Sequence, residues 1–211
     1  MKTSIAFIIA IIGWVALFLK LQLRIEMEDV ATSESVLRYF SYFTILTNLM
    51  VTIYFSTIVL FKKRETVLHK PGTLTAITAF MTFVGLAYHI LLRSLWNPTG
   101  LTMLLDETHH TLVPLVTIIF WYLYENKSAI SFKKISIWIL YPVLYLIWAL
   151  VRGNISSFYP YYFLDVNNLG IQQVIINAFG LLAVIVLFLF IYFLIGKRIK
   201  TNTYRLNSNK K

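Results

Sequence analysis

The sequence alternates between long apolar stretches and short polar ones. A bilayer core is crossed by about 20 apolar residues in helical conformation, and six stretches come near that length. They cover residues 5–23, 37–61, 72–94, 108–124, 133–151 and 171–196. Helices are expected because a helix satisfies its own backbone hydrogen bonds in lipid. The pattern predicts an all-α polytopic membrane protein, with six transmembrane helices in one bundle and a single domain over residues 1–211.

Composition supports a lipid environment. Of the 211 residues, 58% are hydrophobic and only 13% are charged, which is more apolar side chain than a soluble domain of this length buries. The chain has no cysteine, and this excludes disulfides, a thiolate nucleophile and cysteine-based metal sites. The first stretch follows Lys2 as in a signal peptide, but no small-residue cleavage site precedes Lys20, so we expect an uncleaved span.

The basic residues indicate an orientation rather than a nucleic-acid partner. Most of the 19 Lys and Arg residues lie at the N-terminus, around residues 62–70 and 127–134, and after residue 196, whereas most of the nine acids lie in the other loops. By the positive-inside rule both termini are cytoplasmic and loops 24–36, 95–107 and 152–170 face outward.

Polar residues recur inside the spans, near their outer ends. At 100° per residue Ser41, Thr44, Asn48 and Thr52 fall within about 80° of one another on one helix face. The other spans contribute further polar, charged or aromatic residues at a similar depth: His89, Arg93, Asp106, Glu107, His110, Tyr145, Trp148, Arg152 and Asn177. Because ionisable residues in a membrane usually face the bundle interior, this convergence predicts a polar cavity for an amphipathic or lipid-like molecule.

Other interpretations of these residues stay open. Ser and Thr in membrane helices commonly bond back to the i−4 carbonyl, and Arg93 and Arg152 can snorkel to lipid phosphates. Asp106, His110 and His89 could bind a metal, but the sequence contains no HExxH motif, so we predict no metal and no cofactor. Two alternatives remain: a non-catalytic lipid or small-molecule binding or transport protein, and a metal or haem protein using His89 and His110.

Three segments resemble a known family. "RYFSYFTILTNL" (38–49), "HHTLVP" (109–114) and "RGNISSFYPYYFLD" (152–165) are similar to the androgen-induced-gene and androgen-dependent TFPI-regulating protein family. The closer resemblance is to its bacterial integral-membrane relatives, and it implies a location in a bacterial plasma membrane. The eukaryotic members are six-span hydrolases of fatty acid esters of hydroxy fatty acids, and they use a threonine nucleophile and a histidine.

The resemblance implies roles for particular residues. By motif, the threonine falls on Thr44 and the histidine on His110, so we expect a threonine-dependent ester hydrolase with membrane lipids or lipid-like substrates as its partners. Asp106 or Glu107 is expected to fix the imidazole. Asn48, Arg152 or a backbone N–H is expected to stabilise the oxyanion. The acyl chains are expected against aromatic side chains, with further residues in support: Trp14, Phe43, Tyr145 and Trp148, then His89, Arg93 and Asn177.

Overall fold

The structure, a computed structural model, describes residues 1–61, 67–95 and 97–208, and every regular element in these ranges is helical. The all-α prediction is therefore confirmed for them. Basic residues 62–64 and 210–211, which entered the orientation argument, lie outside this part. The α-helices are α1 (Lys2–Met27), α2 (Thr32–Tyr39), α3 (Phe43–Leu60), α4 (Thr73–Ala87), α5 (Gly100–Glu107), α6 (Val113–Tyr124), α7 (Phe132–Ser136), α8 (Leu140–Ser156) and α9 (Val166–Ser208).

Short helical turns connect or interrupt these helices. Two are π-helical, η2 (Tyr88–Leu92) after α4 and η4 (Thr108–Leu112) between α5 and α6. The others are 3₁₀ turns: η1 (Val67–His69), η3 (Arg93–Leu95), η5 (Lys127–Ala129), η6 (Ile137–Ile139) and η7 (Tyr162–Leu164). Within α9, Gly170 has a left-handed, non-helical conformation (φ 74°, ψ 155°), which glycine adopts readily.

Within the described residues, five helical stretches are long and apolar enough to cross a membrane. They are Lys2–Met27, Phe43–Leu60, Thr73–Leu95, Phe132–Ser156 and Val166–Ile199. Large apolar side chains remain exposed along them, for example Phe18 on α1 and Phe179 on α9. Such surfaces are stable in lipid rather than in water, and they indicate an integral membrane protein. The helical stretch from Gly100 to Tyr124 is not among the five, and it carries the polar run Asp106–His110.

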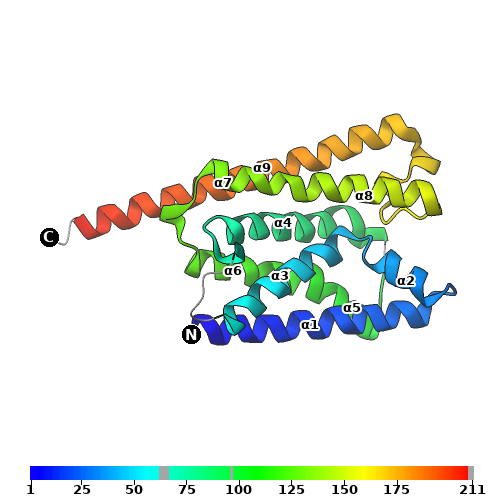
Figure 1. The fold of residues 1–211 in the computed structure, drawn as a ribbon, viewed down its shortest axis with the longest axis horizontal. Coiled ribbons are helices and arrows are strands. Elements are labelled where there is room, and N and C mark those ends of the chain that lie inside the picture. Colours follow the sequence, from blue (N-terminus) through cyan, green and yellow to red (C-terminus); the bar gives the residue numbers. More distant parts are fainter. Residues whose placement is uncertain (62–66, 96, 209–211) are drawn as a thin grey trace.

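The helices lie side by side along one long axis (Figure 1). Helix α1 forms one side, α8 and α9 form the other, and α3, α4 and α6 lie between them. The N-terminus and the C-terminal part of α9 lie at the left of Figure 1, whereas α2 and the loop between α8 and α9 lie at the right. We call the right-hand end the cavity end.

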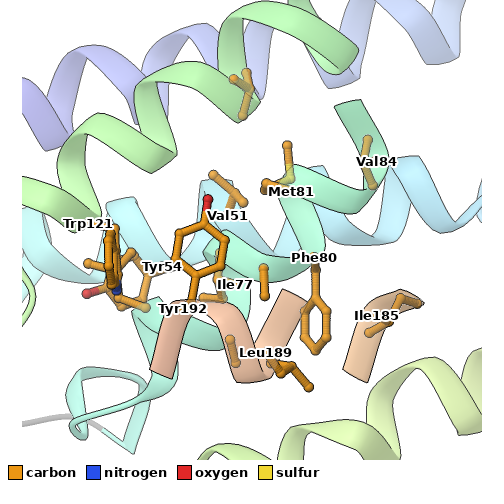
Figure 2. Close-up of a cluster of buried hydrophobic side chains, with 14 of the residues drawn as sticks. Val51, Tyr54, Ile77, Phe80, Met81, Val84, Trp121, Ile185, Leu189 and Tyr192 are labelled. Atoms are coloured by element: carbon orange, nitrogen blue, oxygen red, sulfur yellow. The ribbon is translucent and has the colours of Figure 1, made fainter. Parts of the chain in front are cut away.

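The buried hydrophobic core is centred on α4, which packs against α3, α6 and α9. Figure 2 shows the buried side chains of this cluster: Val51, Tyr54, Ile77, Phe80, Met81, Val84, Trp121, Ile185, Leu189 and Tyr192. Polar groups within the core are paired across helices. Trp121 Nε1 donates to Thr75 Oγ1 (2.9 Å), and the hydroxyls of Thr82 and Tyr192 lie 2.7 Å apart. Pairing of this kind removes the cost of burying them.

One expected helix is interrupted. A continuous helix over 37–61 was predicted, but α2 ends at Tyr39 and α3 begins at Phe43, with extended backbone at Tyr42 (φ −86°, ψ 128°). Ser41 therefore does not share a helix face with Thr44. The alternative interpretation of the hydroxyls applies to several of them: Ser41, Thr47 and Thr52 bond back to the carbonyls of Leu37, Phe43 and Asn48.

Candidate functional site

The helix break places Thr44 in the first turn of α3, where backbone N–H groups have no partner within the helix. Two tyrosine hydroxyls from distant parts of the chain bind backbone groups at the helix break. The N–H of Thr44 donates to the hydroxyl of Tyr161 (3.3 Å), and the hydroxyl of Tyr145 donates to the carbonyl of Ser41 (3.1 Å). The break is thus held by tertiary contacts, and it leaves the Thr44 side chain at the start of a helix rather than along one.

His110 lies in the π-turn η4, opposite the π-turn η2. Its Nδ1 lies 2.8 Å from the main-chain carbonyl of Asp106, which can only accept a hydrogen bond, so Nδ1 carries the proton. In the neutral imidazole the lone pair is then on Nε2, as a general base requires. The ring stacks on Tyr88, with centroids 4.0 Å apart and planes at 11°. Gly85 permits this approach, because a Cβ there would lie 3.0 Å from the His110 carbonyl oxygen.

Thr44 and His110 line the same cavity, which has a volume of about 490 Å³ and lies at the cavity end of the bundle. Four charged residues, on α1, just after it and on α5, form part of its wall in two ion pairs. Lys20 Nζ is 2.6 Å from Asp106 Oδ1, and Arg24 pairs with Glu28. The cavity wall therefore contains charged groups of both signs among largely apolar side chains.

Thr44 also lines a second, apolar space on its other side. This crevice, of about 40 Å³, lies between α3, α4, α8 and α9, and Thr44, Leu92 and Tyr161 are common to both spaces. Aliphatic and aromatic side chains form most of its wall: Phe43, Phe83, Val84, Tyr145, Leu146, Phe163, Leu164, Leu181, Leu182 and Ile185. Thr44 therefore lies where a cavity with charged residues in its wall meets an apolar crevice.

Asn48 links the two candidate catalytic elements. Its Nδ2 donates to the Thr44 carbonyl (2.9 Å) and to the His109 carbonyl (3.2 Å). The second bond has a local cause. In π-helical register the donor to His109 would be the residue five positions on, and that residue is Pro114, which has no N–H. Asn48 supplies the missing donor, so the expected oxyanion role is not its role in this structure.

The acidic residues next to His110 have other partners than expected. The Asp106 carboxylate pairs with Lys20, and the main-chain carbonyl of Asp106 is the group that orients the His110 imidazole. Glu107 accepts a hydrogen bond from Thr111 (2.7 Å) and pairs with Arg93 (2.9 Å). Glu107 thus belongs to a separate surface network.

His89 and Arg93 form the rest of that network and do not line the cavity. Arg93 donates to His89 Nδ1 (3.0 Å), so Nε2 carries the proton and donates to Thr111 Oγ1 (2.9 Å). His89 was expected at the cavity, but 100° per residue does not hold through the π-turn η2, where Tyr88 rather than His89 meets His110. In the described residues no group of three or more His, Asp or Glu side chains is arranged to hold a metal.

Arg152 was expected at the oxyanion, but it binds Glu34 instead. The Nη2 atom of Arg152 lies 2.6 Å and 2.7 Å from the two carboxylate oxygens of Glu34, and this ion pair connects α8 to α2. Hydrogen bonds from Arg38 and Arg152 lower the pKa of the Glu34 carboxyl below its ordinary value of 4.5. Neither residue lines the cavity or the crevice at Thr44.

The remaining predicted residues divide between the crevice and the surface. Phe43 and Tyr145 line the crevice, as expected for residues that contact an acyl chain. Trp14 and Trp148 are exposed instead. Asn177 Nδ2 donates to the Phe163 carbonyl (2.8 Å) and so fixes the loop between α8 and α9. Tyr161, in that loop, was missed, although it lies inside the "FYPYYFLD" segment that carries the family resemblance.

Comparison of the chain with known protein families, curated proteins and solved structures gives no match.

Proposed function

We propose that this protein is an intramembrane ester hydrolase with Thr44 as nucleophile and His110 as general base. The observation that carries the proposal is that Thr44 and His110 line one cavity with charged residues in its wall, while Thr44 also borders an apolar crevice. An amphipathic ester would place its polar part among the charged residues of the cavity and the beginning of its hydrocarbon at the mouth of the crevice. Fatty acid esters of hydroxy fatty acids, the substrates implied by the family resemblance, belong to this class.

In the proposed reaction, His110 Nε2 accepts the proton of Thr44 Oγ1 as that oxygen attacks the ester carbonyl carbon. A threonine hydroxyl is a weak nucleophile, so the base is required. Collapse of the tetrahedral intermediate breaks the ester C–O bond, and the imidazolium gives its proton to the departing alcohol. A water molecule, deprotonated by the same imidazole, then hydrolyses the acyl-threonine and releases the carboxylic acid.

The proposed topology has six spans. Adding Gly100–Tyr124 to the five stretches gives an even number of crossings. An even number agrees with the N-terminus and the end of α9 lying at the same end of the bundle (Figure 1). The clusters of Lys and Arg near that end favour a cytoplasmic location for both termini. The cavity would then open toward the outer leaflet of a bacterial plasma membrane.

The test uses purified protein in detergent with a panel of lipid esters and a fluorophosphonate probe. Thr44→Ala is expected to abolish turnover and covalent labelling, and His110→Ala to lower turnover by about 10²–10⁴-fold. Thr44→Ser, which keeps a hydroxyl, is expected to retain labelling. Thr117→Val is the control, since that hydroxyl bonds only to the Val113 carbonyl of its own helix (2.7 Å). Turnover by folded Thr44→Ala at the wild-type rate would rule the proposal out.

A further inference from the structure

Tyr161 contacts the candidate nucleophile and has no chemical role so far. Its hydroxyl oxygen lies 3.4 Å from Thr44 Oγ1 and 3.3 Å from the Thr44 backbone nitrogen. Tyr161 also lines both the cavity and the crevice. A substrate carbonyl attacked by Thr44 must therefore lie next to this phenol.

The Tyr161 ring is held on two sides. It stacks on Phe163, with centroids 5.0 Å apart and planes at 8°, and it meets Tyr42 edge-on at 5.6 Å. The loop around it is fixed by the Asn177 bond to Phe163 and by Gly153, against which the ring of Tyr159 packs. A donor held in this way loses little freedom when a transition state forms, which is what effective electrostatic catalysis requires.

The hydrogen-bond pattern fixes the role of the hydroxyl as a donor. The Thr44 N–H can only donate, so the phenol oxygen accepts and its own proton is left to donate. Accepting a bond from the backbone also polarises the O–H and strengthens it as a donor. Burial raises the pKa of Tyr161 to about 12, so the phenol keeps its proton at neutral pH.

We propose that Tyr161 is a catalytic residue that donates a hydrogen bond to the oxyanion formed when Thr44 Oγ1 attacks the ester carbonyl. This inference rests on the proposed hydrolase function. The proton balance is unchanged, since Tyr161 keeps its proton throughout and His110 carries the nucleophile proton to the leaving alcohol. Tyr161 takes the place that the sequence assigned to Asn48 or Arg152.

The test compares Tyr161→Phe, which keeps the ring contacts, with Tyr162→Phe, a change at the next residue, whose side chain is 53% exposed. Loss of one oxyanion donor is expected to lower kcat of Tyr161→Phe by about 10²–10³-fold, with KM within about twofold of wild type. Affinity for an alkyl boronic acid, which forms a tetrahedral adduct with the nucleophile, is expected to fall by a similar factor. Tyr162→Phe is expected to match wild type in all three measurements.

The outcomes separate this inference from the function on which it rests. If Thr44→Ala is inactive but Tyr161→Phe keeps wild-type kcat, the oxyanion role is wrong and the hydrolase stands. If Tyr161→Phe raises KM at unchanged kcat, the hydroxyl binds the ground state and the inference is likewise overturned. Absence of any ester turnover or labelling in wild type would overturn the function, and the inference with it.

Discussion

The hydrogen bonds of Asn48 to the Thr44 and His109 carbonyls can be tested without assuming any catalytic activity. Asn48→Leu keeps approximate side-chain volume and removes both hydrogen bonds from Nδ2. The bond to Thr44 lies within α3 and persists when the helices separate in a membrane-like environment, so its loss costs little tertiary stability. The bond to His109 joins α3 to η4 and exists only in the folded bundle.

The magnitude follows from that one interhelical bond. Hydrogen bonds between membrane helices contribute about 0.6 kcal/mol on average and up to about 1.7 kcal/mol. The His109 carbonyl is also left without its donor, because Pro114 has no N–H to offer, and an unsatisfied buried acceptor costs about 1–3 kcal/mol. We therefore expect Asn48→Leu to lower the free energy of unfolding by about 1–3 kcal/mol.

The assay is unfolding by sodium dodecyl sulfate in mixed micelles, followed by tryptophan fluorescence and circular dichroism. Thr117→Val, which removes a bond within one helix, is the control and is expected to change stability less. Pro114→Ala restores an N–H that can reach the His109 carbonyl, so the cost of Asn48→Leu should shrink in that background. An equal cost in both backgrounds would refute the explanation given for the Asn48 contact.

Two further predictions concern the cavity end. Gly153→Ala places a Cβ 2.0 Å from a ring carbon of Tyr159, and it should lower stability by about 1–3 kcal/mol in the same assay, whereas Gly180→Ala, with open space around it, should not. The two arginine partners of Glu34 lower its pKa, so the stability it contributes is complete above pH 4.5 and is lost as pH falls through the lower folded-state value. Thermal unfolding of wild type and Glu34→Gln should differ at pH 7 and converge on acidification. A constant difference across that range would contradict the assignment.

Hydropathy located several of the long helical stretches. The stretch 72–94 corresponds closely to Thr73–Leu95, and 5–23 lies within α1 (Lys2–Met27). In these segments local composition decides the structure, because an apolar stretch in lipid has helix as its low-energy conformation.

Hydropathy could not predict the helix break before α3. The stretch from Phe40 to Tyr42 contains no Pro or Gly, the residues that usually mark an interruption. The break depends on hydroxyls from Tyr145 and Tyr161, which lie far along the chain. The local sequence contains no information about these distant tyrosines, so it predicted a continuous helix.

The π-turns explain which candidate residues were misplaced. His89 was expected to line the cavity because of its depth in the span, but η2 adds a residue to the turn and brings Tyr88 there instead. In η4 the same geometry leaves the His109 carbonyl to Asn48. Thr44 and His110 themselves came from motif resemblance, and periodicity alone ranked them with several other polar residues.

The break at Phe40–Tyr42 also has a consequence for biogenesis. The Ser41 carbonyl and the Thr44 N–H are bound by tyrosines 104 and 117 residues further along the chain. While α1 and α3 are already made and α8 is not, these backbone groups lack the partners that the finished bundle supplies. Unpaired backbone in an apolar layer is costly, so a nascent chain in this state is a substrate for quality control until its C-terminal third is inserted.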